Sequence, residues 1–242
     1  MRYILFCLMF VALSSGAHGN ALVADLSKDH ISIRSDFSGE TLLLFGAIDG
    51  ASDGATDIAV VLRGPAIDFT LRKKTRQAGI WVNSETYRIA DLPAFYAVVS
   101  TAPLYQIAPA HTRLAQKIGV QSLQGGDHKD KQAIRAFIRL REGENLYSES
   151  EGGVKLINGR LFRAEITLPA GMPIGTYITE FFAFRDGKII GYQTGQLPVD
   201  TVGAGNFMYK AAHETPLLYG LGGVFFAAFL GWFAALVFRR RL

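Results

Sequence analysis

The stretch from Pro216 to Phe238 reads PLLYGLGGVFFAAFLGWFAALVF and carries no charged residue. At a rise of about 1.5 Å per residue, a helix of this length crosses a hydrocarbon core of roughly 30 Å. The alternative is the core helix of a globular domain, but such helices rarely stay uncharged for more than about 18 residues. The sequence therefore predicts a transmembrane helix over residues 215–238.

Three arginines, Arg239, Arg240 and Arg241, follow this stretch directly. Basic residues beside a membrane-spanning helix are retained on the cytoplasmic side. We therefore expect a single-pass protein of the bacterial inner membrane. Residues 239–242 form its cytoplasmic tail, and everything before the helix is periplasmic.

The predicted span has two different faces. Small side chains recur at every fourth position, at Gly223, Ala227, Gly231 and Ala235. Aromatic side chains gather on the opposite arc, at Phe225, Phe226, Phe229, Trp232 and Phe233. A stripe of small residues lets another helix backbone approach closely. Gly and Ala are also common in membrane helices in general, but their separation from the aromatics favours a packing face for a partner helix or a second copy.

The first 19 residues have the three parts of a secretory signal peptide. Arg2 supplies the positive charge, Tyr3–Leu13 is a short apolar run, and small residues such as Ser15-Gly16-Ala17 follow. An uncleaved N-terminal anchor is the alternative, but the apolar run is too short to span comfortably. The single cysteine, Cys7, lies in this segment, so the exported chain needs no disulfide.

The formal net charge of +4 does not describe the exported part. Arg2 and the three arginines after the span belong to targeting and topology, which leaves 21 basic residues against 21 acidic ones. A balanced exported domain lacks the basic surface that nucleic-acid binding needs. We therefore expect the inner-membrane lipid and another membrane protein as partners, and no nucleic acid.

Strand signals dominate the exported chain. Thr41–Ile48 and Asp57–Arg63 are apolar runs, and shorter strands are predicted at Ile67–Leu71, Ile80–Val82, Glu85–Ile89 and Phe95–Val99, with Gly, Pro and Asp between them. Leu161–Leu168 alternates between apolar and polar residues, and Asp186-Gly187 is a strong hairpin signal. This spacing predicts a mainly β fold with an antiparallel, immunoglobulin-like sandwich.

Two segments between these strands have a helical pattern. Residues 109–118 predict one short helix. Lys131–Arg141 predicts another, with Ile134, Phe137, Ile138 and Leu140 near one face. The chain is therefore divided as follows: signal peptide (1–19), first β-rich region (20–103), helical connector (104–144), second β-rich region (145–200), stalk (201–214), transmembrane helix (215–238) and cytoplasmic tail (239–242).

Two charged clusters are candidate binding sites. Asp49, Asp53 and Asp57 lie in a Gly-rich turn, but their spacing differs from that of a calcium loop, and a solvated turn explains them better. Arg72, Lys73, Lys74 and Arg76 form the main basic cluster of the exported part. They could contact an anion or lipid, but lysines also protect a solvated edge strand, which is the simpler interpretation.

Known catalytic patterns do not occur in the sequence. The histidines His18, His30, His111, His128 and His213 show no metal-ligand spacing, and there is no G-x-S-x-G, haem-attachment or phosphate-loop motif. We therefore expect no enzyme, no metal site and no cofactor, although a catalytic site dispersed over the chain would leave no such pattern.

Several segments resemble one family along nearly the whole exported chain. They are LVADLS (22–27), FSGETLLLFGAID (37–49), RGP (63–65), IWVN (80–83) and LFRAEITLPAGMPIGTY (161–177), followed by the single span with its arginines. This pattern resembles the alphaproteobacterial "putative transmembrane protein" family, whose members have a signal peptide and one C-terminal span. The resemblance brings no catalytic residues. Through gene association it implies an accessory role beside a sulfite-exporter-type transporter.

Taken together, the sequence favours a non-enzymatic, membrane-anchored accessory or assembly module beside an inner-membrane partner. A periplasmic binding or sensing module for an anionic solute or metal ion is the alternative. A hydrolase with a dispersed site is a third hypothesis, which predicts a deep pocket with shifted pKa values.

Overall fold

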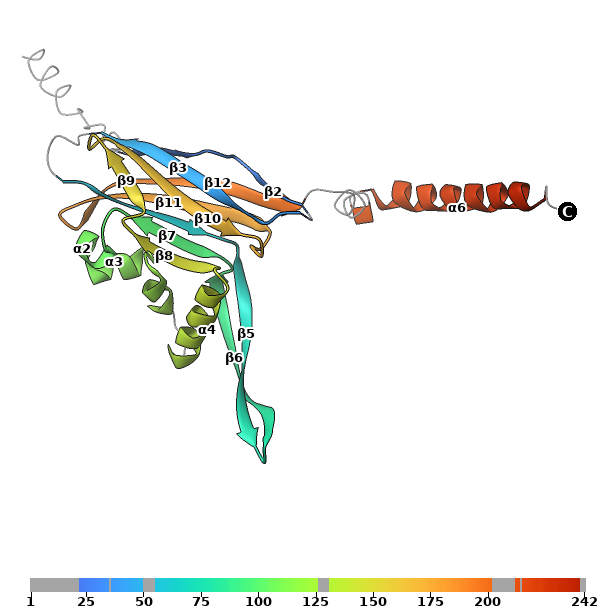
Figure 1. Cartoon of the computed structure of the whole chain (residues 1–242), viewed down its shortest axis with the longest axis horizontal. Coiled ribbons are helices and arrows are strands. Elements are labelled where there is room, and N and C mark those ends of the chain that lie inside the picture. The colour runs from blue at the N-terminus through green and yellow to red at the C-terminus, as the bar shows by residue number, and fades with distance from the viewer. Residues whose placement is uncertain are drawn as a thin grey trace, which may run out of the picture.

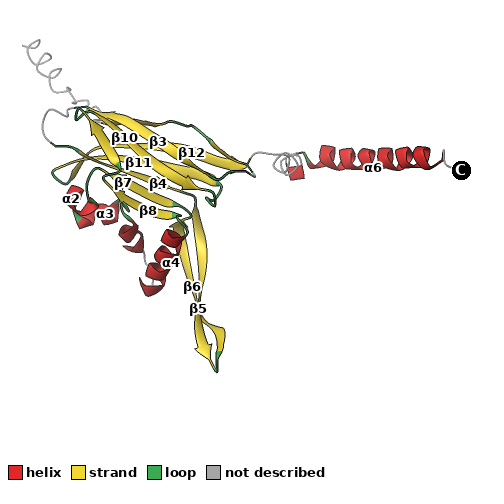
Figure 2. Cartoon of the chain, viewed as in Figure 1, coloured by secondary structure: helices red, strands yellow, loops and turns green. Residues whose placement is uncertain are grey.

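A computed structural model describes residues 22–34, 36–49, 55–125, 131–201, 212–213 and 215–239. The predicted signal peptide, Asp53, most of the stalk and the last three residues lie outside the described residues. Two β-sheets face each other and form a sandwich, and a single long helix follows near the C-terminus (Figures 1 and 2). The predicted fold class, mainly β with one C-terminal apolar helix, is confirmed.

The first sheet has four antiparallel strands in the order β1-β3-β10-β9. Their bounds are β1 (Leu22–Leu26), β3 (Gly39–Ile48), β10 (Leu161–Pro169) and β9 (Val154–Ile157). The long pairing of β3 with β10 joins the first and second β-rich regions. On β10 the inward side chains Phe162, Ala164, Ile166 and Leu168 are all buried and alternate with exposed neighbours, as the sequence predicts.

The second sheet has six strands in the order β2-β12-β11-β4-β7-β8. Their bounds are β2 (Ile31–Ile33), β12 (Lys188–Thr201), β11 (Gly175–Arg185), β4 (Asp57–Arg63), β7 (Tyr96–Ser100) and β8 (Tyr147–Glu151). Strand β4 has the predicted bounds, and its five central residues are buried because both faces are covered. Both β-rich regions contribute strands to both sheets, so they share one sandwich.

The sandwich interior is filled by side chains from both sheets. Phe162 on β10 and Phe181 on β11 meet across it with ring centroids 6.1 Å apart. Close packing is visible at Gly46 of β3, where an added Cβ would lie 2.4 Å from the carbonyl oxygen of Val23 and 2.6 Å from the Phe162 ring. A larger side chain at this position would separate β1 from β3.

The strand pairs of the sandwich are mostly antiparallel, as predicted, but the two edge pairs of the six-stranded sheet are not. There, β2 pairs with β12 and β8 pairs with β7 in parallel. A parallel pair needs a long crossover, and the helical connector supplies it between β7 and β8. It contains α2 (Leu104–Ile107), α3 (Ala110–Ala115), the 3-10 helix η3 (Val120–Gly125) and α4 (Lys131–Gly143).

Helix α4 matches the predicted helix over Lys131–Arg141 closely. Helix α3 is shorter than the single helix predicted over 109–118, and α2 precedes it. The reason is local backbone geometry: Lys117 and Gly119 have φ values of +51° and +91°, which no α-helix contains.

Strands β5 (Ala66–Gln77) and β6 (Ile80–Pro93) form a two-stranded arm that leaves the sandwich (Figure 1). The prediction of three short strands in this segment is therefore wrong. β5 and β6 pair over nearly their whole length, with irregularities between Ile67 and Phe69 and between Lys73 and Lys74. Such bulges interrupt the apolar alternation, which is why the sequence resembles several short strands.

The hairpin predicted at Asp186-Gly187 is confirmed. β11 and β12 pair across it, and the φ angles of Asp186 and Gly187 are +49° and +75°. A two-residue turn with positive φ at both positions matches the twist of antiparallel strands. The C-terminal helix α6 (Pro216–Arg239) likewise covers the predicted span, and its segment Pro216–Leu236 is long and apolar enough to cross a membrane.

Candidate binding groove

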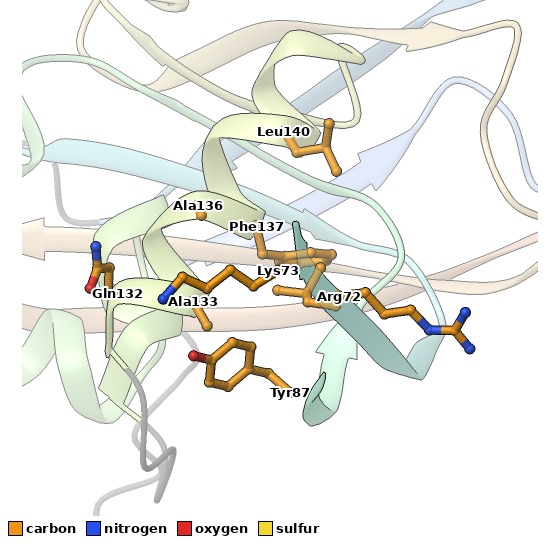
Figure 3. Close-up of a pocket in the computed structure, with 9 residues that line it drawn as sticks. Arg72, Lys73, Tyr87, Gln132, Ala133, Ala136, Phe137 and Leu140 are labelled. Carbon is orange, nitrogen blue, oxygen red and sulfur yellow. The ribbon is translucent and has the colours of Figure 1, made fainter. Parts of the chain in front are cut away.

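A groove of about 430 Å³ lies between α4 and the β5–β6 arm (Figure 3). Its volume is within the range of small-molecule sites. Its lining residues are Leu71, Arg72, Lys73 and Tyr87 from the arm, and Gln132, Ala133, Ala136, Phe137 and Leu140 from α4. The floor is apolar and the polar groups stand at the rim, so the groove suits an amphipathic ligand or protein segment.

Aromatic packing holds the arm against α4 beneath the groove. The rings of Phe69 on β5 and Phe137 on α4 are 4.5 Å apart, and Phe137 meets Tyr147 of β8 edge-on at 6.0 Å. The hydroxyl of Tyr147 donates a 2.6 Å hydrogen bond to the carbonyl of Pro93, the last residue of β6. Burial raises the pKa of Tyr147 above its usual range, so this hydroxyl remains a hydrogen-bond donor at physiological pH.

Arg141 at the end of α4 fastens the same junction. Its guanidinium lies 4.8 Å from the centre of the Phe69 ring and 5.5 Å from that of Phe137. It also donates to the carbonyl of Ala94, at 3.2 Å, and pairs with Glu144 at 2.9 Å. Cation–π contacts of a desolvated arginine contribute up to about 2 kcal/mol. The position of the arm base relative to α4 is therefore well determined.

The groove exists because two side chains of α4 that face the arm are small and a third, Leu140, is left uncovered. Ala133 and Ala136 leave space beside the arm. Leu140, which the sequence places on the buried face with Ile134, Phe137 and Ile138, is 55% exposed. Leu140 lies on the same side of α4 as Phe137, but it borders the open groove, which leaves it uncovered.

The predicted basic cluster is divided by the structure. Lys73 reaches toward α4 in Figure 3, whereas the guanidinium of Arg72 points away from it. Lys73 lies 3.6 Å from Glu85 on β6, which also accepts a hydrogen bond from Tyr87. Lys74 and Arg76 lie beyond the groove, opposite Asn83 and Trp81 near the arm tip. The groove itself therefore has two cations and one carboxylate nearby.

Sequence reasoning missed the α4 side of the groove, namely Gln132, Ala133 and Ala136, and the role of Tyr87. The signal in the sequence was the pair of small residues Ala133 and Ala136 near the start of the predicted helix, together with the basic cluster on a separate predicted strand. Pairing of that helix with that strand is a long-range contact, so it could not be derived from either segment alone.

The aspartate cluster is not assembled as a site in the described structure. Asp57, the first residue of β4, accepts a 2.7 Å hydrogen bond from the hydroxyl of Thr101, and Asp49 lies in the turn directly after β3. Asp53 lies outside the described residues. In the part of the chain that the structure describes, no three His, Cys, Asp or Glu side chains gather closely enough to hold a metal ion.

The small-residue stripe lies on α6 as predicted, at Gly223, Ala227, Gly231 and Ala235. A Cβ added at Gly223 or Gly231 would meet no described atom within 4 Å. The stripe is therefore sterically open to another helix, on the opposite side from aromatic neighbours such as Phe229 and Phe233, whose ring centroids are 6.3 Å apart.

Comparisons with known proteins identify the family of the chain. No curated protein matches the chain. Among solved structures, one match is Spo0M, a sporulation control protein from Bacillus subtilis, with 10% identity and a TM-score of 0.29. The match covers 81% of this chain and 56% of that structure, and such a low TM-score supports no argument about function. A family model, by contrast, matches residues 21–240. The chain thus belongs to the family described as "Putative transmembrane protein (Alph_Pro_TM)", as its sequence segments indicated.

Proposed function

We propose that the protein is a non-enzymatic accessory module of the bacterial inner membrane, with its sandwich in the periplasm and its C-terminus in the cytoplasm. The observation that carries this proposal is the open, apolar-floored groove between α4 and the arm, in a chain that also has a candidate membrane span. The anchor keeps the groove close to other membrane proteins, which raises the effective concentration of any partner segment.

An amphipathic segment of a membrane protein fits the groove in shape and charge. Helix-in-groove recognition uses apolar anchors laid into an apolar channel, and Phe137 and Leu140 supply such a surface. Arg72 and Lys73 at the rim favour a partner with acidic residues beside its apolar ones. The family resemblance suggests a sulfite-exporter-type transporter as the candidate partner class, and self-association through the span is the alternative.

Filling the groove is expected to release the partner without unfolding the protein. Ala136 is exposed and lies at the groove, so Ala136→Trp occupies the space at little cost in stability. We expect the amount of membrane protein that co-purifies with the full-length variant in mild detergent to fall at least tenfold, as measured by quantitative mass spectrometry.

The matched control is Ala110→Trp, the same change at an exposed position of α3 outside the groove. It should leave recovery of the partner unchanged. Equal recovery with Ala136→Trp and with wild type would contradict the assignment of the groove as the docking site.

A second candidate function, binding of a small anionic solute, is favoured by the two rim cations Arg72 and Lys73. It differs from the first in its readout. A solute would raise the melting temperature of the purified protein without any partner, by an amount that grows with the logarithm of its concentration above Kd, and Ala136→Trp would abolish that shift.

The helix-packing face leads to a separate expectation. Gly231→Leu places a bulky side chain at the centre of the small-residue stripe, whereas Phe229→Leu changes only the aromatic face. Because helix association in lipid depends on close backbone contact, Gly231→Leu should weaken association several-fold and Phe229→Leu should leave it nearly unchanged. A membrane two-hybrid reporter at matched expression measures both, and equal signals from Gly231→Leu and wild type would show that the stripe is only compositional.

A further inference from the structure

The tip of the β5–β6 arm presents apolar side chains that no described part of the protein covers. Ile80 is 69% exposed and Trp81 is 66% exposed, directly after the turn at Ala78-Gly79. Neither side chain contributes to the sandwich core or to the groove. Exposed large apolar residues grouped at the end of a projecting element are typical of a contact surface.

Cationic residues lie behind these apolar residues along the arm. Arg76 is the cross-strand partner of Trp81, and Lys74 is the partner of Asn83, so these two cations lie on the Trp81 face of the hairpin. Arg72 follows toward the base. Of the arm's four clustered cations only Lys73 has a carboxylate, that of Glu85, within ion-pair distance among the described residues. The outer arm is thus apolar at its end and cationic behind it.

The arm leaves the sandwich at the end from which the chain continues to the membrane helix. Pro65 immediately precedes β5 and packs on Gly175, where an added Cβ would lie 2.8 Å from its Cγ. Gly175 is in turn the register partner of Val199, two residues before β12 ends at Thr201. The base of the arm therefore lies near the end of β12, after which the chain continues toward α6.

The dimensions allow the tip to reach the bilayer. Strand β5 has 12 residues, which corresponds to about 40 Å at the usual rise per residue. The connection between Thr201 and Pro216 spans at most about 50 Å when fully extended. The arm and the connection are thus of similar length. Because α6 tethers the sandwich to the bilayer, the effective concentration of the arm tip at the membrane surface is high.

We propose that the tip of the β5–β6 arm is a second membrane contact, which binds the anionic phospholipid surface of the bilayer that α6 crosses. Trp81 has the side chain that prefers the interface between headgroups and acyl chains, and Ile80 adds apolar area beside it. Arg72, Lys74 and Arg76 contribute electrostatic attraction to lipid phosphates. Of the proposed function, this inference requires only that α6 crosses the membrane, and it holds whether or not a partner occupies the groove.

The chain contains two tryptophans, Trp81 at the tip and Trp232 in α6, which allows a direct test. A full-length Trp232→Phe variant has Trp81 as its single tryptophan. It is reconstituted into vesicles of phosphatidylcholine alone or with about one-third phosphatidylglycerol, each with the same fraction of brominated phosphatidylcholine. We expect strong quenching of Trp81 fluorescence by brominated lipid in the anionic vesicles and weak quenching in the neutral ones.

Removal of the cations provides the second part of the test. Arg72→Gln, Lys74→Gln and Arg76→Gln together should lower the ratio of bound to free tip on the order of 100-fold, because each cation near an anionic surface contributes roughly fivefold. The control removes three cations from the sandwich, at Lys155, Arg160 and Lys188. Arg160 and Lys188 lie at the end remote from Val199. This control should leave quenching unchanged.

Two results would overturn the proposal. One is quenching that is the same in neutral and anionic vesicles and insensitive to the three arm substitutions. The other is a Trp81 that stays unquenched in vesicles without a partner protein and becomes shielded only with a co-purified membrane protein, which would identify the tip as a protein contact. Because the vesicles contain no partner, loss of lipid binding and loss of partner binding in the groove are separate outcomes.

Discussion

Replacing Glu180 by alanine is expected to lower the free energy of unfolding by about 3 kcal/mol. Glu180 on β11 forms an ion pair with Arg63 of the neighbouring strand β4, and the two side chains are only 12% and 19% exposed. Burial lowers the pKa of Arg63, but an arginine still remains charged at physiological pH. Removal of the carboxylate therefore leaves a charged guanidinium mostly buried without its counter-ion.

The expected effect lies at the low end of the range for buried pairs because Arg63 keeps other acceptors. It donates to the carbonyls of Gln116, at 2.6 Å, and Lys117, at 3.1 Å, just after α3. Glu180 also accepts a 2.9 Å hydrogen bond from the hydroxyl of Tyr192 on β12, and the alanine would remove this bond as well. The pair thus joins three strands to the helical connector.

A double variant separates charge burial from lost packing. Arg63→Met with Glu180→Leu removes both charges and should recover most of the stability, since a buried ion pair contributes little compared with apolar residues of similar volume. The exposed pair of Arg163 and Glu165, 56% and 55% exposed, is the control: Arg163→Gln should change stability by less than about 1 kcal/mol. Chemical denaturation of the full chain in mild detergent measures all three, and a double variant as unstable as Glu180→Ala would contradict this account.

Elements whose pattern is local could be predicted from the sequence. The alternation of β10, the doubly buried strand β4, the Asp186-Gly187 turn and the apolar span each depend on residues within one segment. For such segments side-chain period and turn chemistry determine the structure directly. Pairing between distant segments is different, because several registers bury the same apolar residues.

The candidate groove shows this limit most clearly. Its two walls are the β5–β6 arm and α4, which are separated along the chain by β7, α2, α3 and η3. The basic cluster from Arg72 to Arg76 was visible in the sequence, but nothing local indicated that Lys73 would reach toward α4, where Ala133 and Ala136 line the groove. The Ala78-Gly79 turn that makes the arm one hairpin also lacks the strong Asn-Gly or Asp-Gly signal.

Helix α4 offers the sharpest comparison between periodicity and packing. Phe137 and Leu140 lie three residues apart, which places them on one side of a helix. The structure buries Phe137, at 2% exposure, and leaves Leu140 at 55%. Amphipathic periodicity identifies the side of the helix that faces the protein, but the extent of the neighbouring element decides which residue on that side is covered.

Phe137→Ala is therefore expected to cost about 4 kcal/mol, whereas Leu140→Ala on the same helix should cost less than about 1 kcal/mol. The alanine at 137 removes the ring that contacts Phe69 and Tyr147, and it leaves a cavity that the β-sheet behind it cannot fill. Arg141 loses one of its two aromatic contacts at the same time. Leu140 borders the groove and is largely exposed, so its truncation removes little buried apolar surface and leaves no closed cavity.

Hydrogen exchange distinguishes a local from a global effect of Phe137→Ala. If Phe137 fastens the arm, backbone amides near the arm base, around Phe69 and Ile89, should exchange faster than in wild type by a larger factor than those of β4 in the sandwich interior. Leu140→Ala should change neither set. A uniform increase over both sets would mean that α4 supports the whole sandwich rather than the arm, and equal stabilities of the two variants would show that the groove closes over Leu140 in solution.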